Sequence, residues 1–499
     1  MKKKKLIILC ILAALLLALI TTAVILKIRY DEKMEQLRIY NATYLVVDGI
    51  EYRRDSTSLD LSNKQIGEFD KLKELTALRQ LNLRSTGITA AQYDALRAAL
   101  PGCSISWSVP FQGGFYDDDT QELTLTELSN SDVAMLSYLP ALTSINADAC
   151  RDYEPLFILM EQYPDITVTY TVPIGDLTVG HTEETITISD PDASELFARL
   201  PLLPALKTVT LEGAVPDNEI MLELKNTFPN IRFSWNFTVC GVEVNSLDDY
   251  LDLSGIALGS TEELEAALPY FYELKKVDMV DCGFSNSEMD DLNWRHPKTR
   301  FIWEVPICGK TFRTDIRYFM PWQIRSGRTM ANLQNLRYCK DIEVMDFGHM
   351  GVSDFSFVED LPKLRCLLVL DCPITDLQSI STCTSLEFLE IAQTTVRDYW
   401  PLTNLSNLKD LNISSTPHNL STHKTSGLND ISMLYQFTQL DRLWSVRSFV
   451  KKARFPEIHG WLPDSVVMLE VSACTSFGWR QSPLYYEHRD IMGMYYMMH

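Results

Sequence analysis

The stretch that decides the fold reads IEVMDFGHMGVSDFSFVEDLPK (342–363), LRCLLVLDCPITDLQSISTCTS (364–385), LEFLEIAQTTVRDYWPLTNLSN (386–407) and LKDLNIS (408–414). Written in lines of 22 residues, it repeats apolar residues in fixed columns, such as Ile342, Leu364, Leu386 and Leu408, or Met345, Leu367, Leu389 and Leu411, or Phe347, Val369, Ile391 and Ile413. Apolar positions that recur at one period indicate a repeat architecture, in which each unit buries its apolar side by stacking on its neighbours. We therefore expect one solenoid coil per line, with a strand at each L-x-L core because that core alternates with a period of two.

The pattern L-x-x-L-x-L-x-x-x-x-(I/V), with a short L-x-x-L turn behind it, resembles the leucine-rich repeat. It is most similar to the internalin-like class of 22-residue repeats found in bacterial surface proteins. The resemblance implies an α/β solenoid, namely a leucine-rich-repeat horseshoe with a concave parallel β-sheet and short helical segments behind it. The family usually places Asn three residues after the strand core, where this chain has Met350, Cys372, Thr394 and Thr416. That departure predicts coils that are less regular than the family's best-ordered members.

A second, longer period precedes these short repeats. The aromatic residues Tyr44, Trp107, Tyr170, Trp235 and Trp303 recur every 63 to 68 residues, and a glycine follows each of them. Each long unit is interpreted as three coils of about 21 residues, with the aromatic residues stacked in the core. The predicted order is long-period repeats over 44–309, an irregular junction coil over 310–341, short repeats over 342–475 and a C-terminal cap over 476–499. The cap is expected to cover the open end of the stack, since an uncovered edge strand invites aggregation.

The N-terminal segment has the composition of a membrane span. Residues 6–26 contain no charge and no proline, and four lysines precede them. As a helix they measure about 31 Å, close to the thickness of the hydrocarbon core. Residues 1–26 are therefore predicted to be a cytoplasmic tail and a single-pass transmembrane helix, with a cleaved secretory signal as the alternative. Residues 27–43 are expected to form a juxtamembrane stalk or, in the favoured interpretation, the N-cap of the first coil.

Composition and motifs narrow the classes of function. The chain has 66 acidic and 45 basic residues and a formal net charge of −21, which disfavours binding to nucleic acid. Its 11 cysteines include no C-x-x-C pair, which disfavours zinc and thioredoxin-type sites, and isolated buried thiols are favoured over a disulfide framework. The recurring Asp354, Asp376 and Asp398 are interpreted as caps of short helical turns rather than as metal ligands. Because hydrolase and nucleotide-binding motifs are also missing, no catalytic residue, metal site or cofactor is predicted.

Two surfaces are candidate binding sites. Strand positions between the buried ones are expected to face the concave side, and in the short coils they are Asp346, Leu368, Phe388, Glu390, Asp410, Asn412, Trp444, Met468 and Glu470. Apolar anchors rimmed by acids are typical of a protein-binding face. The second candidate is a basic patch that would suit an anionic glycan, with a solvated junction as the alternative, and it contains Lys310, Arg313, Arg317, Arg325 and Arg328.

Together these features predict a membrane-anchored, extracytoplasmic protein that binds a protein partner in the manner of a surface receptor or adhesin. The N-terminus would lie in the cytoplasm and the repeats on the opposite side of the membrane. Two alternatives remain open. A cell-envelope hydrolase with an unrecognised site would show a pocket of converging Asp, Glu or His with perturbed pKa values. A structural spacer would show a concave face filled by the protein's own side chains.

Overall fold

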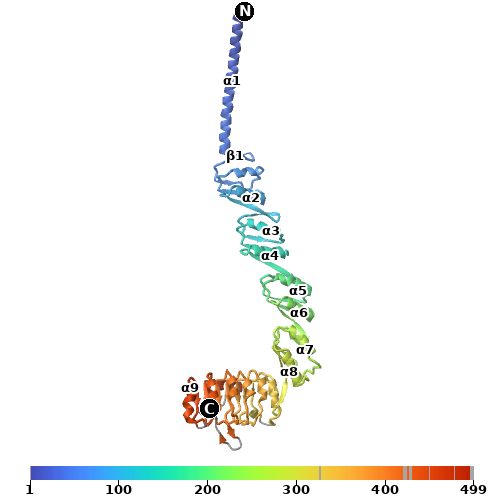
Figure 1. Cartoon of the computed structure of the whole chain (residues 1–499). Coiled ribbons are helices and arrows are strands. Elements are labelled where there is room, and N and C mark those ends of the chain that lie inside the picture. The colour runs from blue at the N-terminus through green and yellow to red at the C-terminus, as the bar shows by residue number, and fades with distance from the viewer. Residues whose placement is uncertain are drawn as a thin grey trace. The chain divides into compact units, whose positions relative to one another are not determined.

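The computed structural model describes residues 2–324, 327–419, 424–425, 430–448, 450–471, 473–476 and 478–494 (Figure 1). These residues group into two compact units. The first consists of Met1–Pro216 and Leu224–Arg232, and the second of Asp217–Glu223 and Phe233–His499. Each unit is built from coils that carry one short strand and one short helix.

The first unit begins with a single long helix, α1 (Lys2–Thr43), none of whose residues is buried. By length and composition α1 is able to cross a membrane, and a secretory signal would have the same properties. The favoured N-cap interpretation of residues 27–43 is wrong, because Tyr30, Met34 and Leu37 are 62, 45 and 49% exposed on the continuing helix. The helix meets the first coil only near its end, where the Tyr40 hydroxyl donates to Glu51 at 2.7 Å. Residues 27–43 therefore continue the helix α1 up to the first coil.

The long repeats share one plan: short parallel strands in neighbouring coils, then an antiparallel hairpin. In the first unit the strands are β1 (Tyr44–Val47), β2 (Ile50–Arg53), β3 (Ser58–Asp60), β4 (Gln80–Leu83), β5 (Ser104–Phe111), β6 (Gly114–Asp117), β7 (Glu122–Thr124), β8 (Ser144–Ala147), β9 (Thr167–Ile174), β10 (Leu177–Gly180), β11 (Thr185–Ser189) and β12 (Thr208–Glu212). The helices behind them are η1 (Phe69–Glu74), α2 (Ala90–Ala99), α3 (Asn130–Met135), η2 (Leu136–Tyr138), α4 (Tyr153–Gln162), α5 (Ala193–Arg199) and η3 (Leu200–Leu202). Strands β3, β4 and β5 pair in parallel, and β5 then pairs with β6 in the antiparallel sense.

The same plan continues past residue 217. The elements are α6 (Asn218–Thr227), β13 (Arg232–Ser234), β14 (Asn236–Val239), β15 (Val242–Asn245), β16 (Tyr250–Asp252), α7 (Glu262–Ala267), η4 (Leu268–Tyr270), β17 (Lys276–Asp278), α8 (Asn286–Arg295), β18 (Arg300–Ile302), β19 (Glu304–Ile307) and β20 (Lys310–Arg313). The recurring aromatic residues lie in the core as predicted, since Trp107, Tyr170, Trp235 and Trp303 are 1 to 4% exposed.

A hairpin interrupts the parallel ladder in the long repeats over residues 44–309. Gln112 and Gly113 have φ angles of 48° and 74°, and Cys308 and Gly309 have φ angles of 53° and 81°. Positive φ at both central residues is the geometry of the type I′ turn that reverses a strand. Each such turn folds the third strand of a repeat back on itself, so the long repeats form several small sheets.

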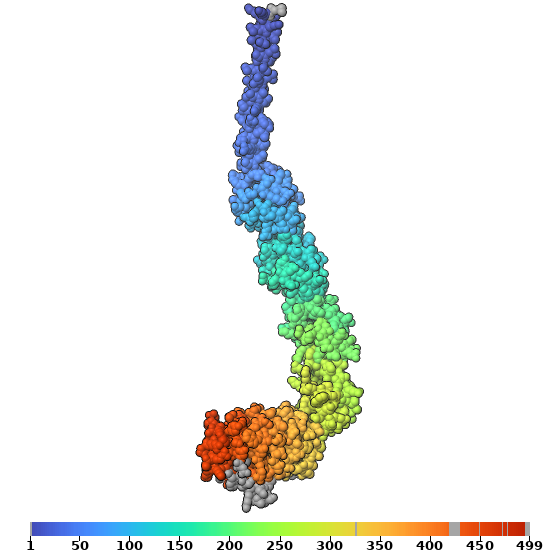
Figure 2. All heavy atoms as spheres, viewed as in Figure 1, coloured from blue at the N-terminus to red at the C-terminus, as the bar shows by residue number. Residues whose placement is uncertain are grey.

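The short coils, in contrast, form one continuous seven-stranded sheet of β21 (Tyr318–Phe319), β22 (Val344–Asp346), β23 (Cys366–Leu368), β24 (Phe388–Glu390), β25 (Asp410–Asn412), β28 (Arg442–Trp444) and β29 (Val466–Met468). All neighbours are parallel, and from β22 to β25 each residue pairs with the one 22 positions later, as Met345 with Leu367. The coils lie side by side from yellow to red in Figure 2. The predicted 22-residue step is therefore confirmed, and the junction over 310–341 supplies the first strand, β21.

The short coils close on the side opposite the sheet with single turns of helix. These are η5 (Pro321–Gln323), η6 (Leu333–Tyr338), η7 (Ser356–Asp360), η8 (Ile380–Thr382), η9 (Trp400–Asn404), η10 (Ser432–Gln436), η11 (Lys452–Arg454) and α9 (Phe455–Trp461). A hairpin of β26 (His418–Asn419) and β27 (Lys424–Thr425) projects from the fourth coil. Asp354, Asp376 and Asp398 each accept a hydrogen bond from the backbone amide two residues later, which closes a local turn. The prediction that they cap the helical turns needs a correction, because the N-cap residues of η7, η8 and η9 are Phe355, Ser379 and Tyr399.

The missing asparagine ladder is replaced by other donors. The Cys372 thiol donates to the Phe347 carbonyl, with 3.2 Å between sulfur and oxygen. The hydroxyls of Thr394 and Thr416 donate to carbonyls of their own turns at 2.9 and 2.6 Å. Three of the four turns thus keep a side-chain donor for the backbone, and only the turn at Met350 has none at this position.

Candidate functional site

The outward face of the short-coil sheet differs from that of the long repeats. In each strand the central residue points into the coil, and its two neighbours point to the other side, which we call the strand face. In the long repeats this face is mostly polar and open to solvent, as at Gln80, Glu122 and Asn146, although Asp278 and Ile302 of the last long repeat are buried. In the short coils the same positions include Cys366, Leu368, Phe388 and Trp444, which are 0 to 2% exposed. Something must therefore cover this part of the sheet.

The cover is the chain's own C-terminal segment, defined here as residues 474–494 without residue 477. It contains η12 (Trp479–Gln481) and α10 (Pro483–Ile491). The local sequence explains the helix, because the Ser482 hydroxyl accepts a hydrogen bond from the Tyr485 amide at 3.1 Å and proline occupies the first helical position. The expectation that residues 476–499 cover the open end of the stack is thus corrected: the described part of them lies across the strands.

Aromatic rings make the centre of this contact. The Phe388 ring lies with its centroid 4.7 Å from that of Trp479 and 5.5 Å from that of Tyr485. The Trp444 ring lies 5.4 Å from the Trp479 ring. Met492 and the apolar residues of β22 and β23 complete one buried cluster. Aromatic side chains of this size supply most of the apolar area that such a contact removes from water.

A buried carboxylate lies within the apolar cluster. The Glu390 side chain is fully buried. It accepts a hydrogen bond from the Trp479 indole at 2.5 Å and two from the Arg480 guanidinium at 3.1 and 2.6 Å. Burial by itself would lower the pKa of Arg480, but the adjacent Glu390 carboxylate raises it above the usual value. Arg480 therefore keeps its charge, and Glu390 depends on the segment for its partners.

A second charged pair lies on the strand face itself. Arg442 is 3.4 Å from the Asp410 carboxylate, donates to the Gly478 carbonyl at 2.5 Å and lies over the rings of Trp444 and Trp479. Burial raises the pKa of Asp410, which is 1% exposed. The Asn412 amide and the Trp444 indole donate to carbonyls of the segment, at Cys474 (2.9 Å) and Ser476 (3.0 Å).

Some polar groups at this contact have no partner. His488 of α10 is fully buried, and neither of its ring nitrogens has a hydrogen-bond partner among the described residues. Burial, assisted by Arg365, lowers the pKa of His488 to about 4, although Glu387, Glu487 and Glu343 act in the opposite direction. His488 is therefore neutral at pH 7.

The predicted concave-face residues fall into two groups. Leu368, Phe388, Glu390, Asp410, Asn412 and Trp444 come together as predicted but are buried under the C-terminal segment, so the expectation that they are open to a partner is corrected. Asp346 and Met468 are partly buried at the margin. Glu470 stays apart, exposed and paired with Lys452. Sequence reasoning missed Trp479, Arg480, Tyr485 and His488, for which the Ser482-Pro483 helix start was the available signal.

The predicted basic patch does not form a free cationic surface. Arg313 binds Asp278 at 2.6 Å and Asp315 at 3.0 Å, and Arg317 binds Glu343 at 2.6 Å. Lys310 is exposed, Arg328 contacts the Met350 sulfur, and Arg325 lies outside the described residues. At least two of the five charges are therefore neutralised by carboxylates.

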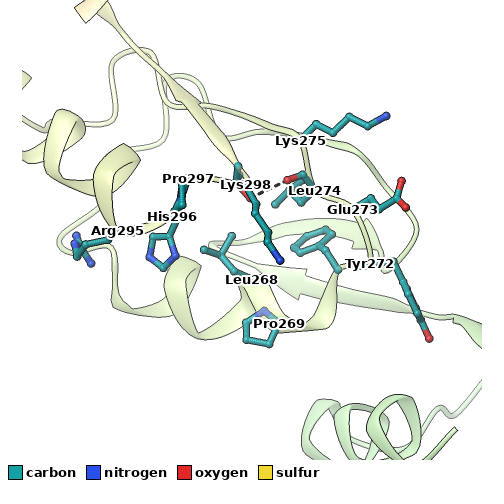
Figure 3. A pocket seen from close by; sticks show the side chains of 12 residues that line it. Leu268, Pro269, Tyr272, Glu273, Leu274, Lys275, Arg295, His296, Pro297 and Lys298 are labelled. Atoms are coloured by element: carbon teal, nitrogen blue, oxygen red, sulfur yellow. Dashed lines mark hydrogen bonds between the residues drawn. The ribbon is translucent and has the colours of Figure 1, made fainter. Parts of the chain in front are cut away.

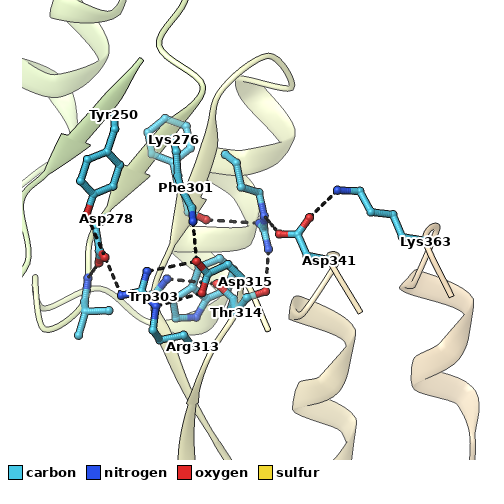
Figure 4. A network of polar contacts seen from close by, with 12 residues as sticks. Tyr250, Lys276, Asp278, Phe301, Trp303, Arg313, Thr314, Asp315, Asp341 and Lys363 are labelled. Carbon is cyan, nitrogen blue, oxygen red and sulfur yellow. Dashed lines mark hydrogen bonds and ion pairs between the residues drawn. The ribbon is translucent and has the colours of Figure 1, made fainter. Parts of the chain in front are cut away.

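These ion pairs belong to a network that joins the last long repeat to the short coils (Figure 4). The Arg300 guanidinium reaches Asp341 and the carbonyls of Thr314 and Tyr338, and Lys363 binds Asp341 from the next coil at 2.6 Å. The role of Arg313 is thus structural in the first instance.

Replacing Arg313 with alanine is expected to cost about 2 kcal/mol, because Asp278, whose side chain is 5% exposed, loses a charged hydrogen bond. Hydrogen exchange of strands β16 to β20 measures the effect. The matched control is Arg317→Ala, whose side chain is 61% exposed and whose pair should contribute less than about 1 kcal/mol. Equal effects of the two changes would contradict this role.

A groove of about 700 Å³ lies at the helical side of the same long repeat, lined by Leu268, Phe271, Leu274, His296, Pro297 and Lys298 among others (Figure 3). His296 is 2.8 Å from Glu265, which also accepts from Arg295 and Thr261. The Arg295 guanidinium is the main reason that the pKa of Glu265 is lowered to about 2. Glu265 does not line the groove, and a carboxylate with so low a pKa is a weak general base with no proton to donate, so the groove gives no support to the hydrolase alternative. Within the described residues no cluster of His, Cys, Asp and Glu has the arrangement of a metal site.

No family model and no curated protein sequence matches the chain. Among solved structures it is similar to an internalin from Listeria monocytogenes, with 12% identity over 85% of this chain and 86% of that chain and a TM-score of 0.24. It is also similar to internalin C2 from Listeria monocytogenes, with 18% identity over 44% of this chain and 79% of that chain and a TM-score of 0.22. A leucine-rich-repeat protein from Leptospira interrogans is similar with 13% identity over 83% of this chain and 96% of that chain and a TM-score of 0.21. With TM-scores this low, the leucine-rich-repeat architecture rests on the repeats and strand register described above.

Proposed function

We propose that the protein is a single-pass, membrane-anchored, extracytoplasmic binding module whose leucine-rich repeats recognise a protein partner, in the manner of an internalin-like surface receptor or adhesin. The supporting observation is that the strand face of the short coils already holds a peptide segment, its own, with aromatic rings and a buried carboxylate. Rings in a desolvated centre with charged groups among them are the composition of a protein-recognition surface. The long exposed helix α1 fits the anchor.

The other candidates have less support. A structural spacer is favoured by one observation, namely that the strand face is filled by the chain's own side chains. An anionic glycan at the basic patch is not favoured, since Arg313 and Arg317 are paired with carboxylates. Catalysis is not part of the proposal, and neither is nucleic acid, which the acidic surface repels.

Partner binding is tested by proximity labelling on intact cells, with a labelling enzyme fused to the repeat region of the full chain. We expect Phe388→Ala and Trp444→Ala to reduce labelling of the partner about 30-fold, the effect of removing a residue central to an interface. The matched control is Trp294→Ala, since Trp294 is 80% exposed on α8 and remote from the strand face in sequence. A partner labelled at wild-type level by both strand-face variants would refute this surface.

The intact mass of the mature protein distinguishes a retained membrane anchor from a cleaved secretory signal.

A further inference from the structure

The contact between the strand face and the C-terminal segment has the chemistry of a ligand in its site. We propose that this face is a binding site for a short helical peptide that carries a tryptophan–arginine pair, and that the C-terminal segment occupies the site in cis and must leave before a partner's segment enters. The inference rests on the proposed function only for the existence of a partner.

The floor of the site dictates the chemistry of its occupant. Glu390 is fully buried, and the indole of Trp479 and the guanidinium of Arg480 satisfy it. A buried carboxylate that loses its partners is strongly unfavourable, so any replacement must bring a cation and an N–H donor to the same point. The rings of Phe388 and Trp444 both pack against the Trp479 ring, so a replacement needs an aromatic group at the position of Trp479.

The leucine-rich-repeat fold itself does not require a cover on this face. In strands β7 and β8 of the long repeats the equivalent positions are Glu122, Thr124, Ser144 and Asn146, which are exposed or half-exposed. The change to apolar residues in the short coils therefore creates a surface made for an occupant. The segment that fills it is a separate helix with its own cap at Ser482, and it adds no strand to the sheet, which ends at β29.

The fit of the segment is incomplete. Both ring nitrogens of His488 lack partners in the described part of the chain, although both atoms are buried. These unsatisfied nitrogens weaken the closed state relative to a state in which water or another ligand satisfies them. A segment with an apolar residue at the place of His488 has an advantage over the resident one.

The test uses the full chain in detergent and, as the probe, a fluorescein-labelled synthetic peptide with the sequence of residues 474–494. Arg480→Ala in the chain removes the cis partner of Glu390 and leaves the site intact, so we expect the probe to bind this variant about tenfold or more tighter than the wild type. Binding should vanish when Glu390→Gln is added, and a probe that itself carries Arg480→Ala should not bind. A milder variant, Ser482→Ala, weakens only the cap of α10 and should improve binding about fivefold.

Hydrogen exchange of β22 to β29 in the same samples confirms that the coils remain folded. The proposal is overturned if α10 stays as protected as in the wild type in both the Arg480 and the Ser482 variants and neither binds the probe, because the segment is then a permanent part of the fold. It is also overturned if the probe binds regardless of Glu390. Neither result touches the proposed function, which depends on labelling of a partner by the wild-type chain: a labelled partner without peptide exchange would leave the function in place and remove this inference alone.

Discussion

Replacing Trp479 with alanine is expected to lower the free energy of unfolding of the short-coil stack by about 3 to 5 kcal/mol, the range for truncating a fully buried large aromatic side chain. The Trp479 side chain is fully buried between Phe388 and Trp444. Its indole also donates to Glu390 at 2.5 Å, so the change leaves a buried carboxylate with fewer hydrogen bonds. Because the residue belongs to the segment and not to the coils, the loss should fall on the contact between them.

Hydrogen exchange in denaturant is the measurement, with separate values for α10 and for strands β23, β24 and β28. We expect α10 to lose its protection and the strands to keep part of theirs. Trp294→Ala is again the control, and it should change stability by no more than about 0.5 kcal/mol because the side chain is exposed. An α10 helix that remains fully protected in the Trp479 variant would show that Trp479 does not hold the segment.

Acidification is expected to weaken the same contact through His488. The pKa of this residue is about 4 when the segment is bound, below the ordinary histidine value of 6.5 that it regains on release, so the released state binds more protons. The penalty is absent above about pH 6.5, grows as the pH falls and is complete below about pH 4. From these two values the contact should lose about 2 kcal/mol between pH 7.5 and pH 5. Arg365, Glu343, Glu387 and Glu487 are the charged groups that act on His488.

The decisive variant is His488→Phe, which keeps an aromatic ring of similar size and removes the titrating group. Hydrogen exchange of α10 is measured in this variant and in the wild type at each pH. Comparing the two proteins at the same pH removes the pH dependence of the intrinsic exchange rate. In the variant we expect the protection of α10 to stay nearly the same as the pH is lowered. We also expect it to exceed the protection in the wild type at every pH, because the two unsatisfied ring nitrogens are gone. A wild-type contact as strong at pH 5 as at pH 7.5 would contradict a neutral, buried His488.

The columns of apolar residues were sufficient to predict the short coils. Apolar side chains that recur every 22 residues are all buried only if each 22-residue coil stacks on the next in the same register. They were not sufficient for the long repeats. The glycine after each aromatic residue marks a turn, but the sequence does not show that the positive φ angles at Gln112 and Gly113 fold the strand into an antiparallel hairpin. Residues 27–43 have a spacing that suits either a cap or a free helix, and only the exposure of Met34 and Leu37 distinguishes the two.

For the candidate site, the sequence was sufficient to predict the strand-face residues but not the segment that covers them. The positions of Phe388, Glu390 and Trp444 followed from the period of two, and the structure places them together. Their cover did not follow, because the segment around Trp479 repeats nothing, and a pattern in one sequence cannot tell which surface a non-repeating tail will pack against. Glu390 in particular was interpreted as a rim acid, although its partners are 89 and 90 positions away in the chain.

The unbroken course of α1 has a mechanical consequence in the proposed topology. Beyond residue 26 the helix continues to Thr43, which corresponds to about 25 Å of rigid rod at 1.5 Å per residue. Such a rod clears the lipid headgroups, and it offers no swivel at the water boundary. A lateral force on the first coil would therefore tilt the membrane-embedded part of the helix. The anchor would then transmit force as well as hold the protein at the membrane.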